Sequence, residues 1–350
     1  MSEPLATRPL GRTGVGVTVL GQGSAPLGNL YRPVSDEAAR ETFDAAIALG
    51  IRYFDTAPYY GFGLSERRLG DALRGRADVV LSTKVGRLLR PAPDADTASD
   101  RHGFVSPMPF EPVYDYSYDA ILRSHEQSLQ RLGLGTIDIL LIHDIGRLTH
   151  GERHAATLDQ LTEGGGLDAL GRLREEKLVS AIGVGVNEID ICLELMDGID
   201  LDVLLLAGRY TLLEQGAIEQ LLPRCVAEDV SMVIGGPFNS GILATGTSTP
   251  ATPRYNYDSA PPAVRERVAH LESVCANYDV PLAAAALQFP LSHPAVASVI
   301  PGFGSAAEVR AGVAHFRTPI PPEFWAELQR EQLIDERAPV PEGQFRAAPE

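Results

Sequence analysis

The sequence has few features of a secreted or membrane-bound protein. Its three cysteines, Cys192, Cys225 and Cys275, are scattered and odd in number, which does not fit a disulfide framework. The N-terminal segment has no apolar core of a signal peptide. The longest apolar stretches fall short of the roughly 20 residues that span a bilayer. We therefore expect a cytoplasmic protein with no membrane partner.

Basic residues are also scarce, with 30 Lys and Arg against 46 Asp and Glu and a net charge of -16. A nucleic-acid-binding domain usually carries a basic stripe, and the sequence contains none. This balance excludes nucleic acid as the expected partner. The oligomeric state is not readable from the sequence.

Several common binding and catalytic motifs are missing. Neither segment 21–26 nor segment 183–187 completes the GxGxxG turn of a dinucleotide-binding Rossmann unit. His150 and His154 have helical spacing, but no glutamate directly follows the first histidine as it does in HExxH zinc sites. We expect no metal site. An open, doubly wound sheet remains the alternative fold.

Short runs rich in Val, Ile and Leu alternate with amphipathic segments along the chain. Such buried strands between helices predict a parallel sheet covered on both faces. Eight such units fit a closed (β/α)8 TIM barrel better than an open sheet. The amphipathic segments include 35–50 and 117–133, which begin at Ser35 and Ser117 as expected helix caps and end at glycines. The eight apolar runs lie near residues 17, 52, 79, 137, 179, 201, 230 and 296.

One barrel domain is expected over residues 1–337, followed by a loose C-terminal tail at 338–350. Three segments rich in polar residues, proline or glycine follow predicted strands, namely 86–116, 144–156 and 237–261. We expect them to be elongated loops at the C-terminal face of the barrel, where active sites of this fold lie.

Side chains of complementary chemistry stand at three predicted strand ends. Asp55 ends the second run and Tyr60 follows it, Lys84 ends the third run, and His143 ends the fourth. A lysine cation is expected to lower the tyrosine pKa from about 10, and a carboxylate keeps that lysine charged. A histidine can orient a substrate oxygen.

This set predicts hydride chemistry at a carbonyl or alcohol carbon. Tyr60 is the expected general acid or base, Lys84 tunes it, Asp55 anchors Lys84, and His143 orients the substrate. Each residue alone also fits a purely structural role, but their joint placement at strand ends favours a catalytic site.

The motifs resemble those of a known family. The segment Gly50–Gly70 closely resembles the first signature of the aldo-keto reductases. STK at 82–84 and LIHD at 141–144 resemble the strand ends that carry the lysine and histidine of that family. The resemblance extends over most of the chain and implies a nicotinamide-dependent (β/α)8 barrel.

The resemblance also implies where the cofactor binds. Gly302 and Glu308 stand where many NADP-dependent members have basic residues. A 2′-phosphate requires cations, whereas a carboxylate suits the free ribose hydroxyl of NAD. We therefore predict NAD rather than NADP, with Arg310 as the competing basic residue. The predicted cofactor residues are Gly23, Ser24, Asn187, Gly236, Pro237, Phe238, Asn239, Ser240, Gly241, Pro301, Gly302, Gly304, Ser305 and Glu308.

Segments 25–31, 183–188, 207–215 and 235–243 are similar to the aldose 1-dehydrogenase branch of the family. This similarity implies oxidation of a free aldose of the L-fucose or D-threo-aldose type at C1 to the lactone, with Tyr60 as base. The open alternatives are a pyridoxal 4-dehydrogenase, an NADPH-dependent aldehyde or ketone reductase, and a non-catalytic cofactor-binding sensor or regulatory subunit. The candidate substrate residues are Tyr31, Tyr59, Asp144 and Arg209.

Overall fold

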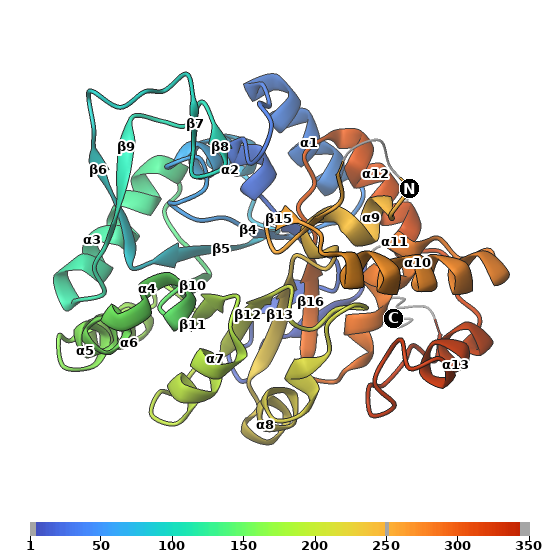
Figure 1. Cartoon of the computed structure of the whole chain (residues 1–350). Coiled ribbons are helices and arrows are strands. Elements are labelled where there is room, and N and C mark those ends of the chain that lie inside the picture. The colour runs from blue at the N-terminus through green and yellow to red at the C-terminus, as the bar shows by residue number, and fades with distance from the viewer. Residues whose placement is uncertain (1–4, 249–251, 344–350) are drawn as a thin grey trace.

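The computed structural model describes residues 5–248 and 252–343 of the chain (Figure 1). Eight parallel strands form one sheet, and parallel bridges from Leu20 to Val299 and from Gly23 to Gly302 join its first and last strands. The sheet therefore closes into the predicted (β/α)8 barrel. In order around the barrel, the strands are β3 (Gln22–Gly23), β4 (Tyr53–Asp55), β5 (Val80–Val85), β10 (Ile139–His143), β11 (Ala181–Val186), β12 (Val203–Ala207), β13 (Ser231–Gly235) and β16 (Val296–Ile300).

Helices surround the barrel, and neighbours such as α1 and α2, α2 and α3, or α12 and α1 pack side by side (Figure 1). The α-helices are α1 (Asp36–Ala48), α2 (Leu64–Leu73), α3 (Tyr118–Leu132), α4 (Arg147–His150), α5 (His154–Thr162), α6 (Gly166–Glu175), α7 (Ile189–Met196), α8 (Leu221–Glu228), α9 (Ile242–Thr245), α10 (Pro262–Asn277), α11 (Leu282–Gln288), α12 (Ala306–Phe316) and α13 (Pro322–Arg330). The 3-10 helices are η1 (Ala25–Gly28), η2 (Gly151–Arg153), η3 (Gly216–Ile218), η4 (Asn239–Gly241) and η5 (Phe289–Ser292). No helix in the described part of the chain is both long and apolar enough to cross a membrane.

The apolar run near residue 17 divides between two structures. Its first part is β2 (Gly16–Thr18), which pairs antiparallel with β1 (Thr7–Pro9), and only its last part enters the barrel as β3. Leu10 and Val17 of this hairpin pack against inward-facing strand residues. The hairpin therefore covers the N-terminal end of the barrel, opposite the strand ends that carry the candidate site.

The helix caps follow the sequence at one position and depart from it at another. The Ser35 hydroxyl accepts a hydrogen bond from the Ala38 amide at 3.1 Å, as predicted. Ser117 also occupies an N-cap position, but its hydroxyl donates to Asp115 at 2.7 Å and makes no cap bond. The prediction of a Ser117 side-chain cap is therefore wrong, because the nearby carboxylate competes for its hydroxyl.

The three predicted loops follow barrel strands and contain more regular structure than the sequence indicated. Segment 86–116 holds a hairpin that projects from the barrel beside α3 (Figure 1). The short strands in these segments are β6 (Arg87–Pro91), β7 (Asp100–Arg101), β8 (Phe104–Val105), β9 (Phe110–Tyr114), β14 (Arg254–Tyr255) and β15 (Asp258–Ser259).

The predicted tail at 338–350 lies only partly within the described residues. Ala338 is buried, and its carbonyl accepts a hydrogen bond from Gln329 at 3.3 Å. The first residue of the predicted tail thus contacts α13.

Candidate active site

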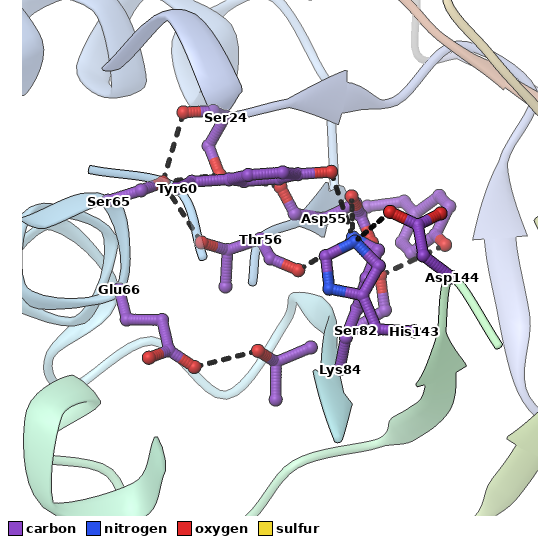
Figure 2. A network of polar contacts seen from close by, with 12 residues as sticks. Ser24, Asp55, Thr56, Tyr60, Ser65, Glu66, Ser82, Lys84, His143 and Asp144 are labelled. Atoms are coloured by element: carbon purple, nitrogen blue, oxygen red, sulfur yellow. Dashed lines mark hydrogen bonds and ion pairs between the residues drawn. The ribbon is translucent and has the colours of Figure 1, made fainter. Parts of the chain in front are cut away.

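The C-terminal ends of three neighbouring strands bring four of the predicted residues together (Figure 2). Asp55 is the last residue of β4, Lys84 lies near the end of β5, and His143 is the last residue of β10. Tyr60 comes from the loop between β4 and α2. In a parallel barrel these positions point to one mouth, and the side chains meet there as the sequence predicted.

Lys84 forms the centre of this group. Its ammonium donates to Asp55 Oδ2 at 2.7 Å, to the Thr56 carbonyl at 2.8 Å and to the Tyr60 hydroxyl at 3.2 Å. The second oxygen of Asp55 accepts a hydrogen bond from Ser82 at 2.8 Å. All three donors of the ammonium are therefore used, and the buried Asp55 carboxylate has a partner at each oxygen.

The protonation of Tyr60 differs from the expectation. Burial raises the pKa of Tyr60 well above its usual value of 10, and the nearby Asp55 charge raises it further. The prediction of a lowered Tyr60 pKa is therefore wrong, because burial and the Asp55 charge disfavour the phenolate. Tyr60 holds its proton at neutral pH in this structure, and its base form grows only as the pH rises.

His143 is held in its neutral form beside Tyr60. The two rings are perpendicular at 89°, with centroids 6.1 Å apart. Burial lowers the pKa of His143 well below its usual value of 6.5, and the charges of Arg87 and Lys84 lower it further. Its Nε2 lies 3.5 Å from Asp144 Oδ2, and its buried Nδ1 has no hydrogen-bond partner. A neutral imidazole can hydrogen-bond a substrate oxygen without adding charge.

Hydroxyl groups fix the loop that carries Tyr60 (Figure 2). Ser65 Oγ lies 2.9 Å from both Ser24 Oγ and Thr56 Oγ1, and Ser24 also donates to the Asp55 carbonyl at 2.6 Å. Ser24 is fully buried. Its hydroxyl joins the residue after the first strand to the Tyr60 loop, and its contact with the cofactor stays a prediction.

Glu66 supports the same loop from the opposite side. This glutamate is fully buried and accepts hydrogen bonds from Thr83 at 2.7 Å and from Arg131 at 2.6 Å. It thus connects α2 to β5 and α3. The sequence placed Glu66 only at the start of a helix and gave no sign of this contact.

The predicted adenosine end of the cofactor site lies at the start of α12. Ser305 caps this helix by accepting from the Glu308 amide at 3.2 Å, and Glu308 accepts from the Gly304 amide at 2.8 Å. Amide groups at a helix start suit anionic oxygens, and the Glu308 carboxylate occupies that position. Glu308 also forms an ion pair with Arg32. Because Arg32 neutralises part of the Glu308 charge, this carboxylate should repel the 2′-phosphate of NADP less strongly than the sequence indicated.

Close backbone approaches shape the loops around this end. A Cβ atom at Gly302 would lie 3.0 Å from Pro26, and one at Gly23 would lie 3.3 Å from the Ile300 carbonyl. On the opposite side, segment 236–241 has positive φ angles at Gly236, Asn239, Ser240 and Gly241. Within this segment the amides of Asn239 and Gly241 donate to the carbonyls of Gly236 and Phe238, so the positive φ angles belong to two tight turns. The contact of segments 236–241 and 301–305 with the cofactor stays a prediction.

Not every predicted cofactor residue is free to contact a cofactor. Asn239 is buried. Its side-chain oxygen accepts a hydrogen bond from the Thr211 hydroxyl at 2.6 Å, and its side-chain nitrogen donates to the Gly208 carbonyl at 3.2 Å. Phe238 packs against the core. Both side chains thus have protein contacts that hold the loop. Pro237 is buried, and Pro301 directly follows β16.

The predicted substrate residues contact side chains that the sequence analysis did not identify. Arg87 stacks over Tyr59, with its Cζ 4.1 Å from the ring centroid, and pairs with Asp144 at 2.9 Å. Arg254 stacks over Tyr31 at 4.2 Å. The fourth candidate, Arg209, donates to Asn256 at 2.9 Å.

Tyr257 is a further residue that the sequence analysis did not identify. It lies at the tip of the β14–β15 hairpin with a φ of 66°. Its amide donates to Ser240 at 3.0 Å, and its hydroxyl accepts from Asn187 at 3.4 Å. The hairpin therefore contacts two predicted cofactor residues, Asn187 and Ser240. The only available signal was an asparagine between two tyrosines in a polar insert.

His150 and His154 serve structural roles. His150 lies 3.1 Å from the Tyr116 hydroxyl, and His154 contacts the Ile145 carbonyl at 3.1 Å and Glu194 at 3.2 Å. Over residues 5–248 and 252–343, no three His, Cys, Asp or Glu side chains are grouped to hold a metal ion.

A (β/α)8 barrel with this mouth is the architecture of an oxidoreductase acting on CH–OH or carbonyl groups. Residues 19–331 match the model of the aldo/keto reductase family, and the chain belongs to that family. Aldo-keto reductases bind a nicotinamide cofactor.

Curated relatives cover nearly the whole chain. The pyridoxal 4-dehydrogenase of Microbacterium luteolum is 45% identical, over 93% of this chain and 97% of its own length. The D-threo-aldose 1-dehydrogenase of a Pseudomonas species is 40% identical, over 95% and 98%. The holo form of an aldo-keto reductase from Bacillus halodurans superposes with a TM-score of 0.73 at 26% identity, over 97% and 98%.

Proposed function

We propose that the protein oxidises a cyclic hemiacetal to a lactone with NAD, and that the substrate is a free aldose reacting at C1. The observation that carries this proposal is the buried chain from Asp55 through Lys84 to the Tyr60 hydroxyl, with neutral His143 beside it. This arrangement can move one proton at a substrate oxygen while the neighbouring carbon exchanges a hydride.

The named relatives support a hemiacetal as the reacting group. Aldoses close into rings in which C1 carries a hydrogen and a hydroxyl, and pyridoxal has a hydroxymethyl group beside its aldehyde that can close in the same way. Loss of the C–H hydride and the O–H proton converts either hemiacetal into a lactone. The proposed reaction would therefore suit the substrate named for either relative.

Each residue of the mouth has a defined task in this reaction. NAD supplies the carbon that accepts the hydride. Tyr60 takes the hydroxyl proton, and the Lys84 ammonium stabilises the phenolate that precedes this step. Asp55 keeps Lys84 charged and in place. His143 donates a hydrogen bond to the substrate oxygen from a neutral ring, which orients the hydroxyl toward Tyr60.

Pyridoxal is the second candidate, and the half-buried ring of Tyr59, which packs on a buried aromatic cluster, favours it. Tyr59 packs within 5.5 to 6.4 Å of Phe62, Phe104 and His102, measured between ring centroids. Offset and edge-on ring contacts are favourable for a flat aromatic substrate. A sugar ring would use the same wall mainly through its C–H face and would need the polar groups of Asp144 and Arg209 for its hydroxyls.

The proposal is tested by mixing the purified protein with NAD or NADP and a panel of free sugars plus pyridoxal, while following reduced cofactor by absorbance. Rapid NAD reduction on L-fucose, D-arabinose or L-galactose would support the aldose assignment. Turnover of pyridoxal alone would move the second candidate to the front. Preference for NADPH and aldehydes would indicate a reductase, and cofactor binding without turnover would indicate a sensor.

The rate of oxidation should rise toward alkaline pH. The pKa of Tyr60 lies well above 10, so its base form increases throughout the accessible range. Since His143 is already neutral, its protonation does not oppose this rise. Initial rates at saturating NAD between pH 6 and pH 10 measure the effect, and a flat profile would argue against Tyr60 as the base.

Cofactor choice should depend on Glu308. Replacing it with glutamine removes the carboxylate and frees Arg32, so the ratio of kcat/KM for NADP to that for NAD should increase about tenfold. The matched control is Glu37→Gln, because Glu37 lies in the first turn of α1, another helix capped by serine. An unchanged ratio in Glu308→Gln would show that this carboxylate does not select the cofactor.

A further inference from the structure

Arg87 is a buried cation next to the site that the sequence analysis did not single out. It begins β6 three residues after Lys84 and is 6% exposed. Its Cζ lies 4.1 Å from the ring centroid of Tyr59 and 5.0 Å from that of Tyr114, and one of its amino groups lies 2.9 Å from Asp144 Oδ2. Two rings and a carboxylate therefore hold the guanidinium in one orientation.

Stability alone does not explain a charge at this position. Removing a guanidinium from water is costly, and a buried ion pair repays this cost only when the remaining hydrogen bonds are made. The buried Nε of Arg87 has no hydrogen-bond partner. Asp144 in turn has a φ of 45°, which is unusual for a residue other than glycine. Incompletely satisfied charges and strained backbone often occur together at functional sites.

The contacts of Arg87 lead directly to the candidate catalytic residues. Its partner Asp144 follows His143 in the chain and lies 3.5 Å from His143 Nε2. The ring of Tyr59, which it covers, lies 6.3 Å from the His143 ring. The positive charge of Arg87 contributes to the lowered pKa of His143 and acts against the raised pKa of Tyr60.

We propose that Arg87 is a positioning residue for the oxidation proposed above, in which its guanidinium provides a fixed positive charge that acts on His143 and Tyr60 without touching the substrate. The inference rests on the proposed function, because only a proton-transfer reaction makes this charge consequential. Arg87 disfavours an imidazolium at His143 and favours the phenolate of Tyr60, and both effects assist a reaction in which Tyr60 accepts the proton.

Other charged and titratable groups act on Arg87, His143 or Tyr60 or contact their neighbours, and the substitution of Arg87 leaves all of them in place. They come from the barrel strands, the insertions and the hairpin at the mouth. These groups are Asp55, Tyr59, Lys84, Tyr114, Tyr116, Asp144, His150 and Tyr257.

The test compares Arg87→Gln with Arg87→Lys. The glutamine keeps a planar group against the rings and removes the charge, whereas the lysine keeps the charge and loses the planar fork. Protonation of His143 is followed by NMR of histidine-labelled protein, with His143→Asn to assign its signal. We expect His143 to take up its proton at a higher pH in Arg87→Gln than in the wild type, and at nearly the wild-type pH in Arg87→Lys.

Arg101→Gln is the matched control. Arg101 lies in the same insertion, stacks over Phe62 at 4.7 Å and pairs with Glu111 at 2.5 Å, but its charge is not among those that act on His143. In Arg101→Gln, His143 should take up its proton at the same pH as in the wild type. An unchanged titration in Arg87→Gln, or an equal shift in Arg101→Gln, would overturn the proposal.

Kinetics provide a second, independent readout. In Arg87→Gln the oxidation rate at pH 7 should fall by roughly tenfold, and Arg87→Lys should recover most of it. Asp144→Asn removes a charge that raises the pKa of Tyr60, so its pH–rate profile should shift toward lower pH, opposite to Arg87→Gln. If the pH–rate profiles of Asp144→Asn and Arg87→Gln shifted in the same direction, the effects would come from altered packing and not from charge. Because the NMR titration requires no turnover, it still tests Arg87 if the proposed substrate class is wrong.

Discussion

Replacement of Tyr60 by phenylalanine is expected to lower kcat by about 10²- to 10⁴-fold, the usual contribution of a positioned acid or base. The substitution removes only the hydroxyl that lies 3.2 Å from Lys84 and leaves the ring against His143. Binding of NAD, measured by fluorescence or calorimetry, should change little. The loss should therefore appear in kcat rather than in cofactor affinity.

Tyr59→Phe is the matched control for this prediction. Tyr59 is the adjacent residue, and its ring also faces His143, at 6.3 Å between centroids. Its hydroxyl has no contact with Lys84 comparable to that of Tyr60. A comparable fall in kcat for both variants would show that the aromatic wall, and not the Tyr60 hydroxyl, limits the reaction.

Replacement of Lys84 by methionine is expected to destabilise the fold by about 3–5 kcal/mol at neutral pH as well as to stop turnover. The substitution leaves the buried Asp55 carboxylate without the ammonium that lies 2.7 Å away. Denaturant unfolding followed by circular dichroism measures the change in the free energy of unfolding. Arg12→Met, which breaks an exposed pair with Asp200, should cost less than about 1 kcal/mol.

The destabilisation of Lys84→Met should depend on pH in a defined direction. Burial already raises the pKa of Asp55, so the folded protein binds this proton more readily than the unfolded chain does. A carboxyl whose folded pKa exceeds its unfolded pKa destabilises the fold more as the pH rises between the two values. Lys84→Met should thus be less destabilised in acid than at neutral pH. The double variant Asp55→Asn/Lys84→Met should be more stable than Lys84→Met, and equal stability would contradict the buried-charge explanation.

The barrel and the four residues at its mouth were readable from the sequence for one physical reason. A strand buried on both faces produces a continuous apolar run, and the first polar residue after such a run marks the strand end. Asp55, Lys84 and His143 stand at such ends. Because parallel strands end at the same face, their order along the chain was enough to predict that these side chains meet.

Features that depend on contacts between distant segments were not readable. The ion pairs of Arg87 with Asp144 and of Arg32 with Glu308 join insertions whose relative positions have no periodic signal. The prediction of a lowered Tyr60 pKa was also wrong, because this pKa depends on how completely the surrounding loops exclude water. Only the last part of the run near residue 17 belongs to the barrel, as β3, and no pattern indicated that β2 would pair with β1 before the barrel began.

The way in which the barrel closes has a consequence for biosynthesis. The first strand meets the last through the bridges Leu20–Val299 and Gly23–Gly302, so the ring is complete only after almost the entire chain has left the ribosome. Until β16 emerges, β3 and β13 are open edges, and exposed edges promote pairing with other chains. Nascent or truncated chains that end before Val296 are therefore expected to depend on chaperones, whereas the full-length chain conceals both edges by its own final strand.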